Sequence, residues 1–186
     1  LQLCPVTGAH MNCDLFVSLH CIAVPSYGRG SQARGFEIWT WNRLGNNSAA
    51  GKALSRIEND DPGSRNAAND NLLNRMMIDA LESHALESRR VAKAVREALI
   101  THPYFRSNDR GIDSARFKVL EVYDMPSILI ELGFMTHPDE VRMLFDAKWQ
   151  DKYAQLIYQG IVHYYQVNDP NFPSNSSAGT QISRAK

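Results

Sequence analysis

The centre of the predicted sheet is the stretch Ser127-Ile128-Leu129-Ile130-Glu131-Leu132-Gly133-Phe134. A short run of β-branched and aliphatic residues between Pro126 and Gly133 is typical of a strand buried on both faces. An ionised glutamate in such a strand costs free energy unless it meets a cation, a metal ion or several hydrogen-bond donors. Glu131 is therefore either a satisfied structural carboxylate or a functional group.

A second apolar run also ends on a chemically competent side chain. It is Asp14-Leu15-Phe16-Val17-Ser18-Leu19-His20, and its last residue is a histidine. In open α/β sheets the carboxyl ends of parallel strands line the ligand crevice. If the two strands run parallel in one sheet, His20 and Glu131 face one cleft. A single histidine at a strand end can equally be structural.

The remaining pattern predicts an α/β fold, an open, mostly parallel twisted sheet with helices on both faces, over residues 1–165. Residues 35–41 alternate aromatic and polar side chains, as in a strand with one buried face, and Arg116 to Tyr123 is expected to form another strand after a turn at residues 108–111. The apolar spacing predicts helices over residues 48–59, from about 70 to 81, over 86–100 and from Thr136 onwards. Residues 166–186 are expected to be a polar tail or linker.

The composition is that of an ordinary globular chain. With 186 residues, 44% hydrophobic and 22% charged, it is long enough for one domain with a sizeable core. Twenty basic residues balance twenty acidic ones, so net charge indicates neither nucleic acid nor anionic lipid as a partner. The sequence has no apolar run of the roughly 18 residues that a membrane span requires.

The three cysteines leave the redox compartment open. Cys13 and Cys21 lie at opposite ends of a predicted strand about 25 Å long, so they cannot bridge each other. A disulfide between Cys4 and Cys13 is compatible with the sequence but is not required by it.

Three blocks of the sequence, in chain order, resemble a known enzyme family. They are Asn12 to His20, the segment Asp109-Arg110-Gly111-Ile112 followed by Phe117-Lys118-Val119-Leu120, and Pro126 to Met135. Together they are similar to the zinc-dependent N-acetylmuramoyl-L-alanine amidases, which cut the amide bond between N-acetylmuramic acid and the first L-alanine of the peptidoglycan stem. The resemblance implies a peptidoglycan substrate and a location in the periplasm or cell envelope.

The resemblance also implies roles for the two strand-end residues. His20 would be a zinc ligand, and Glu131 would act beside the metal as general base and then acid. In the family, a first strand with a zinc histidine and a helix with a zinc glutamate precede the strand that ends at His20. Nothing upstream of His20 matches either, so that N-terminal strand and helix are expected to be missing from the amidase-like domain. Two alternatives therefore stay open, a catalytically inactive peptidoglycan- or partner-binding relic and a related zinc carboxypeptidase.

Residues 42–85 resemble the regulatory insertion of the cell-separation subgroup. In that subgroup a glutamate from the insertion occupies the open zinc position until an activator protein withdraws it. Glu58 is the candidate for that glutamate, although it can equally be a solvated helix residue. The resemblance implies a LytM-type activator protein as a partner and a function in cell separation.

Overall fold

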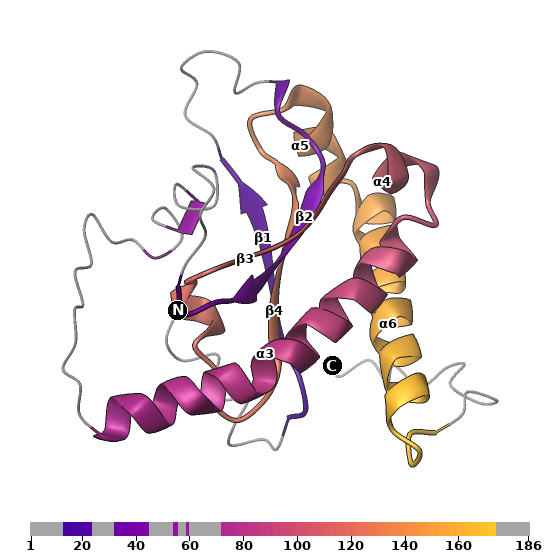
Figure 1. Ribbon diagram of the computed structural model, residues 1–186. Coiled ribbons are helices and arrows are strands. Elements are labelled where there is room, and N and C mark those ends of the chain that lie inside the picture. Colours follow the sequence, from indigo (N-terminus) through magenta and orange to yellow (C-terminus); the bar gives the residue numbers. More distant parts are fainter. Residues whose placement is uncertain (1–12, 24–31, 45–53, 56–58, 60–71, 174–186) are drawn as a thin grey trace, which may run out of the picture.

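The computed structural model describes residues 13–23, 32–44, 54–55, 59 and 72–173. These residues contain a four-stranded sheet in the order β1-β4-β2-β3 (Figure 1). The strands β1 and β4 pair in parallel, as do β2 and β3, whereas β2 and β4 pair antiparallel. The predicted α/β class is confirmed, and two of the three strand pairings are parallel. The strand bounds are Phe16–Ile22 (β1), Phe36–Trp41 (β2), Asp109–Ala115 (β3) and Ser127–Phe134 (β4).

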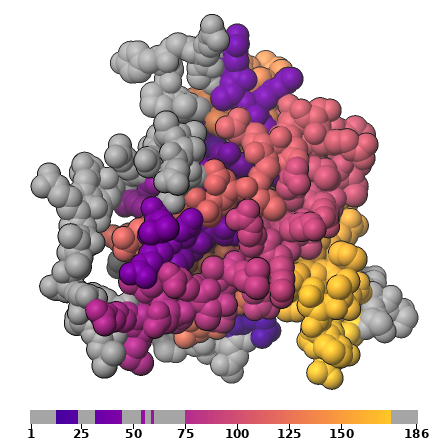
Figure 2. All heavy atoms as spheres, in the orientation of Figure 1, coloured from indigo at the N-terminus to yellow at the C-terminus, as the bar shows by residue number. Residues whose placement is uncertain are grey.

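Two long helices, α3 and α6, pack against each other on one face of the sheet. Figure 1 shows α3 running obliquely across the sheet with α6 beside its C-terminal half, and Figure 2 shows α3 as a continuous magenta band with α6 in yellow at its edge. Short helices connect the larger elements. The helix bounds are Leu72–Leu99 (α3), Pro103–Ser107 (α4), Lys118–Leu120 (the 3-10 helix η2), Pro138–Leu144 (α5) and Ala147–Asn168 (α6).

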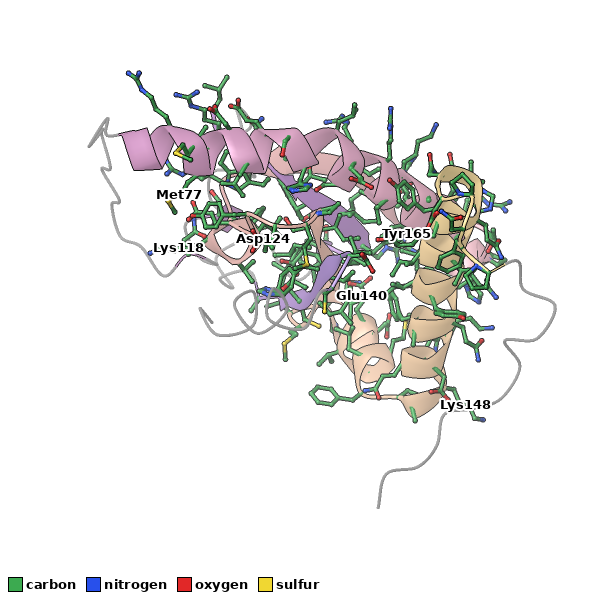
Figure 3. All side chains as sticks on the ribbon, turned by 90° about the horizontal axis from the view of Figure 1, so that it is seen from below. Met77, Lys118, Asp124, Glu140, Lys148 and Tyr165 are labelled. Atoms are coloured by element: carbon green, nitrogen blue, oxygen red, sulfur yellow. The ribbon has the colours of Figure 1, made fainter. Side chains whose placement is uncertain are left out.

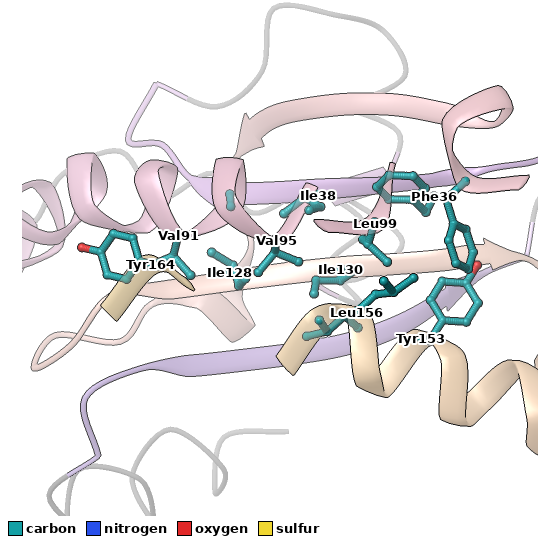
Figure 4. Close-up of a cluster of buried hydrophobic side chains, with 13 residues drawn as sticks. Phe36, Ile38, Val91, Val95, Leu99, Ile128, Ile130, Tyr153, Leu156 and Tyr164 are labelled. Carbon is teal, nitrogen blue, oxygen red and sulfur yellow. The ribbon is translucent and has the colours of Figure 1, made fainter. Parts of the chain in front are cut away.

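Alternating side chains of the sheet form the core beneath α3 and α6. Figure 4 shows how the strand residues meet the two helices across this interface. Because strand side chains alternate between faces, every second residue of β2 and β4 points to this core. The buried cluster shown there includes Phe36, Ile38, Ile128 and Ile130 from the sheet and Val91, Val95, Leu99, Tyr153, Leu156 and Tyr164 from the helices.

The opposite face of the sheet is covered by η2 and the chain on either side of it. Trp39 and Leu129 belong to a second buried cluster with Phe117 and Leu120, and the rings of Trp39 and Phe117 meet edge to face at 5.3 Å. Helical elements therefore lie on both faces. The two long α-helices pack together on the first face, and α3 also contributes Leu81 to this second cluster. This second face is the one that carries the candidate site.

Two of the predicted element boundaries are wrong. The predicted helices at about 70–81 and 86–100 are one helix, α3, because the intervening Glu82 to Ala85 contains no glycine or proline to end it. The strand predicted at 116–123 lies earlier, at Asp109–Ala115, and Lys118–Leu120 forms a 3-10 turn. Gly111, which indicated a turn, instead lies inside β3 with φ +92°, a conformation that glycine tolerates.

The helix predicted to start near Thr136 is found as α5. Its N-cap is His137, whose side chain accepts a hydrogen bond from the Asp139 amide, and Pro138 occupies the first turn. None of the helices in the described part of the chain is long and apolar enough to cross a membrane.

Candidate active site

His20 and Glu131 are register partners on neighbouring parallel strands. Their Cα atoms pair directly between β1 and β4, near the carboxyl ends of both strands. Side chains at paired positions of adjacent strands point to the same face of a sheet. The parallel arrangement that brings an imidazole and a carboxylate together is thus present, and the two residues share one end of the sheet.

Glu37 extends this pair into a row of three side chains. It is the register partner of Glu131 across the antiparallel pairing of β2 and β4. Trp39, two residues on, belongs to the cluster under η2, so Glu37 points to that same face. We call His20, Glu131 and Glu37 the polar row. Glu37 was not predicted as a site residue, although a charged residue in an otherwise buried strand, as at Glu131, is a signal that could have found it.

The polar row is largely shielded from water. Glu131 is fully buried, the Glu37 side chain is 13% exposed, and His20 is partly buried. Burial raises the pKa of the Glu37 carboxyl, and the nearby Arg110 guanidinium opposes that rise. The row therefore combines an imidazole with two carboxylates in a poorly solvated environment, where charges interact more strongly than in water.

Arg110 supplies a cation at one end of the row. Its Nε donates to Glu37 Oε2 at 3.3 Å, and its Cζ lies 5.1 Å from the centroid of the Phe134 ring. Arg110 belongs to β3, yet its side chain reaches past β2 to a residue at the end of β4. Gly35 leaves room for this path, because a Cβ there would lie 3.3 Å from Arg110 Cγ and 2.1 Å from the Asn108 carbonyl oxygen.

Glu140 fixes the backbone on which this end of the site is built. Its buried carboxylate accepts hydrogen bonds from the Gly35 amide at 2.7 Å, the Phe134 amide at 2.8 Å and the Tyr104 hydroxyl at 2.7 Å. Figure 3 shows Glu140 inside the molecule, beside the sheet. Burial, followed by the hydrogen bond to Glu140, raises the pKa of Tyr104 well above its usual value, so Tyr104 remains a donor. Glu140 thereby ties α5 to the ends of β2 and β4.

Cys21 follows His20 in β1 and is partly buried. Burial, and secondly the Glu131 carboxylate, raise the pKa of its thiol. Because the thiolate is the reactive form of cysteine, this environment does not activate Cys21 as a nucleophile. Cys4 lies outside the described residues, and so does the pairing considered for it.

The described residues supply only part of the donor set that a catalytic zinc needs. His20 has the ligand chemistry that zinc prefers, but a catalytic zinc usually takes three protein ligands. Within the described ranges, no three His, Cys, Asp or Glu side chains come together in a way that could hold a metal ion. These residues thus fit one ligand position of a zinc site and do not complete it. Glu58, the predicted zinc-blocking residue, lies outside the residues that the structure describes.

A separate surface pocket of about 340 Å³ lies at the other end of β2. Its lining includes Trp41, Arg43 and Glu82, the last two joined by an ion pair of 3.8 Å. None of the polar row lines this pocket, so it is distinct from the candidate site.

The sequence of this chain is similar to that of one family of known proteins. A family model described as N-acetylmuramoyl-L-alanine amidase matches residues 6–163. The amidase AmiA of Escherichia coli K12 is 28% identical over 160 residues, covering 82% of this chain and 52% of the relative. The amidase AmiC of Neisseria meningitidis serogroup B is 31% identical over 160 residues, covering 84% of this chain and 37% of the relative.

The solved structures agree with the sequence relatives. The N-acetylmuramoyl-L-alanine amidase of Clostridium difficile 630 superposes with a TM-score of 0.57 at 26% identity, covering 87% of this chain and 63% of that chain. Of the two curated relatives, this chain spans about half of AmiA and just over a third of AmiC.

Proposed function

Because this chain belongs to the N-acetylmuramoyl-L-alanine amidase family, we propose that it hydrolyses the amide bond between N-acetylmuramic acid and L-alanine in peptidoglycan. The observation that carries this proposal is the register pairing of His20 with Glu131. This pairing supports the proposal because an imidazole and a buried carboxylate lie on one face of adjacent strands, and the proposed reaction uses one of each.

Glu131 is the proposed general base and acid. It takes a proton from the attacking water as the water oxygen bonds to the amide carbon, and it delivers that proton to the alanine nitrogen as the carbon–nitrogen bond breaks. The products are a carboxylate on the muramic acid lactyl group and a free amine on the stem peptide. The role requires a carboxylate close to the scissile bond in a poorly solvated environment, and the burial of Glu131 supplies that environment.

Zinc is the proposed cofactor, and His20 is the residue of the polar row proposed to ligate it. Zinc, when bound, polarises the substrate carbonyl and makes a neighbouring water more acidic. Further protein ligands must join His20 to complete the usual set of three. The Glu131 carboxylate is proposed to stay beside the metal as base and not to serve as a permanent ligand.

The regulatory and cellular parts of the proposal rest on the family resemblance. Glu58 is proposed to block the zinc position until a LytM-type activator displaces the insertion around it. Action in cell separation, in the periplasm or cell envelope, is the corresponding cellular role. A Glu58→Ala variant should raise hydrolysis without activator, and unchanged basal hydrolysis would exclude this blocking role.

The test is to incubate the purified protein with peptidoglycan sacculi, with and without added zinc, and to identify the soluble products by mass spectrometry. An amidase releases intact stem peptides with a new amino-terminal L-alanine. Release of single terminal amino acids would instead indicate the carboxypeptidase alternative. Binding to sacculi with no release at all would indicate the inactive binding module.

A further inference from the structure

Arg110 is the cation of the candidate site, and its position is unusual for a residue that only balances a charge. It starts on β3, two strands away from β4, yet its guanidinium contacts Phe134 at the end of that strand. Its other contact, Glu37, is the register partner of Glu131. Since neighbouring strands are about 4.8 Å apart, the guanidinium lies on the order of 5 to 8 Å from Glu131.

The Arg110 side chain is restrained but remains accessible. Glu37, its ion-pair partner, is 13% exposed, whereas the Arg110 side chain is 39% exposed. Of the two ion-paired side chains, Arg110 is therefore the one that solvent or a ligand can reach. The contact with the Phe134 ring holds the guanidinium plane from a second side.

The donor geometry of Arg110 suits a carboxylate ligand. A guanidinium has five N–H donors in a fixed fork, and the contact with Glu37 uses Nε. The two terminal amino groups carry the other four donors, which match the two oxygens of a carboxylate in a bidentate contact. Gly35, with φ +104° and no Cβ, permits the side chain to reach this position, and Glu140 anchors the Gly35 and Phe134 amides.

An anionic substrate would be repelled by the two carboxylates of the polar row unless a cation lies nearby. Glu131 and Glu37 place two carboxylates side by side, and a third carboxylate brought by a ligand would be repelled by them. Arg110 is ion-paired with Glu37, the register partner of Glu131, and its positive charge offsets part of that repulsion.

We propose that Arg110 forms a subsite for a carboxylate of the substrate, the α-carboxylate of the second residue of the stem peptide. This inference rests on the amidase function proposed above and adds a specificity determinant to it. In the stem, the second residue is a glutamate, and its α-carboxylate lies about 5 to 7 Å from the bond that is cut, from the length of one to two residues. A distance of this order is compatible with a substrate whose scissile bond lies beside Glu131 and whose α-carboxylate meets the Arg110 guanidinium.

The experiment measures binding of the reaction product, so that it does not depend on turnover. The probes are the dipeptide L-alanyl-D-glutamate with its γ-carboxyl amidated and the same compound with its α-carboxylate also converted to a carboxamide, titrated into the purified protein by NMR. We expect the unsubstituted protein to bind the carboxylate form about tenfold more tightly, as for a charge-assisted hydrogen-bonded pair. Arg110→Gln should abolish this preference.

The control variants separate the subsite from general charge and folding effects. Arg43→Gln removes an arginine of the separate pocket, also ion-paired with a glutamate, and should keep the preference. Arg110→Lys keeps the charge beside Glu37 but loses the planar fork, so it should fold and retain about a threefold preference or less. If Arg110→Gln does not fold, the binding preference of Arg110→Lys is the measurement that tests the subsite.

Equal binding of the two dipeptides by the unsubstituted protein, or a full preference in both Arg110 variants, would overturn the subsite. The binding data also distinguish the two proposals. A carboxylate preference that depends on Arg110, in a protein that releases no stem peptide from sacculi, would support the subsite and contradict the hydrolase.

Discussion

His20 on β1 and Glu131 on β4 pair Cα to Cα across two parallel strands, about 4.8 Å apart. One residue comes from the start of the described chain and the other lies more than one hundred positions later. Parallel pairing near the carboxyl ends of both strands converts this distance in sequence into a shared site. The proposed chemistry depends on that pairing, with His20 as the zinc ligand and Glu131 as the general base.

Replacement of His20 by alanine should weaken zinc binding. His20 is the imidazole of the polar row and the proposed zinc ligand, so its loss should lower the affinity for zinc at least about tenfold. The measurement is a competition titration with a chromogenic chelator. His163→Ala removes an exposed histidine of α6 and is the matched control. Equal zinc affinity in His20→Ala and the unsubstituted protein would remove His20 from the site.

Replacement of Glu140 by glutamine should destabilise the protein. Three hydrogen-bond donors point at the two oxygens of the Glu140 carboxylate. A glutamine side chain has one accepting oxygen, and its NH2 group would face at least one of these donors without forming a hydrogen bond. Because hydrogen bonds to a charged acceptor are strong, we expect a loss of about 2 kcal/mol or more in the free energy of unfolding. Urea titration followed by circular dichroism measures it.

Glu97→Gln is the matched control for that experiment, since Glu97 is exposed and forms a surface i,i+4 ion pair with Lys93. Such pairs contribute about 0.5 kcal/mol or less. A similar, small effect for both variants would show that Glu140 does not anchor the strand ends.

Replacement of Gly160 by alanine should separate α3 from α6. A Cβ at Gly160 would lie 2.5 Å from Val95 Cα and 2.9 Å from the Ala94 carbonyl oxygen. These are backbone atoms that cannot rotate away, so the helices must move apart, at a cost of about 1–3 kcal/mol. Thermal unfolding of Gly160→Ala beside Gln159→Ala, an exposed neighbour, gives the comparison. An unchanged midpoint for Gly160→Ala would contradict the close helix packing.

Ionisation of Tyr164 should make the free energy of unfolding fall at alkaline pH. Its hydroxyl donates to Glu87 at 2.9 Å, and burial, followed by that hydrogen bond, raises the pKa of Tyr164 to about 12. A group with a raised folded-state pKa stabilises the protein below its unfolded pKa, near 10, and loses that contribution as pH rises towards 12. Tyr164→Phe should therefore lose less stability than the unsubstituted protein between pH 10 and 12.

Chemical unfolding at pH 9, 10, 11 and 12 measures this difference. Tyr158→Phe is the matched control, because Tyr158 is an exposed tyrosine of the same helix. Parallel pH profiles for the unsubstituted protein and Tyr164→Phe would show that the Tyr164 hydroxyl is not held protonated by the fold.

The two strands that carry the candidate site could be predicted because each is a short apolar run with a polar residue near its end. His20 and Glu131 were predicted from that pattern, and the parallel pairing that brings them to one face of the sheet is present. Local pattern is informative here because buried strands are continuous in sequence.

Glu37 and Arg110 were missed as site residues because their positions depend on strand order. Whether β2 lies next to β4, and in which direction, is set by long-range pairing, and a register shift of one residue would turn Glu37 to the other face. Arg110 was placed in a turn because Gly111 follows it. In the structure, β3 continues through that glycine and carries Arg110 to the edge of the site.

Turnover of the Glu131→Gln variant decides whether Glu131 acts as the general base. Release of stem peptides from sacculi should fall at least about 100-fold, because the amide cannot accept and return the proton, while zinc affinity and the unfolding midpoint stay close to those of the unsubstituted protein. Glu97→Gln should release stem peptides at the unsubstituted rate. A folded Glu131→Gln protein that hydrolyses sacculi as fast as the Glu97→Gln control would contradict the account.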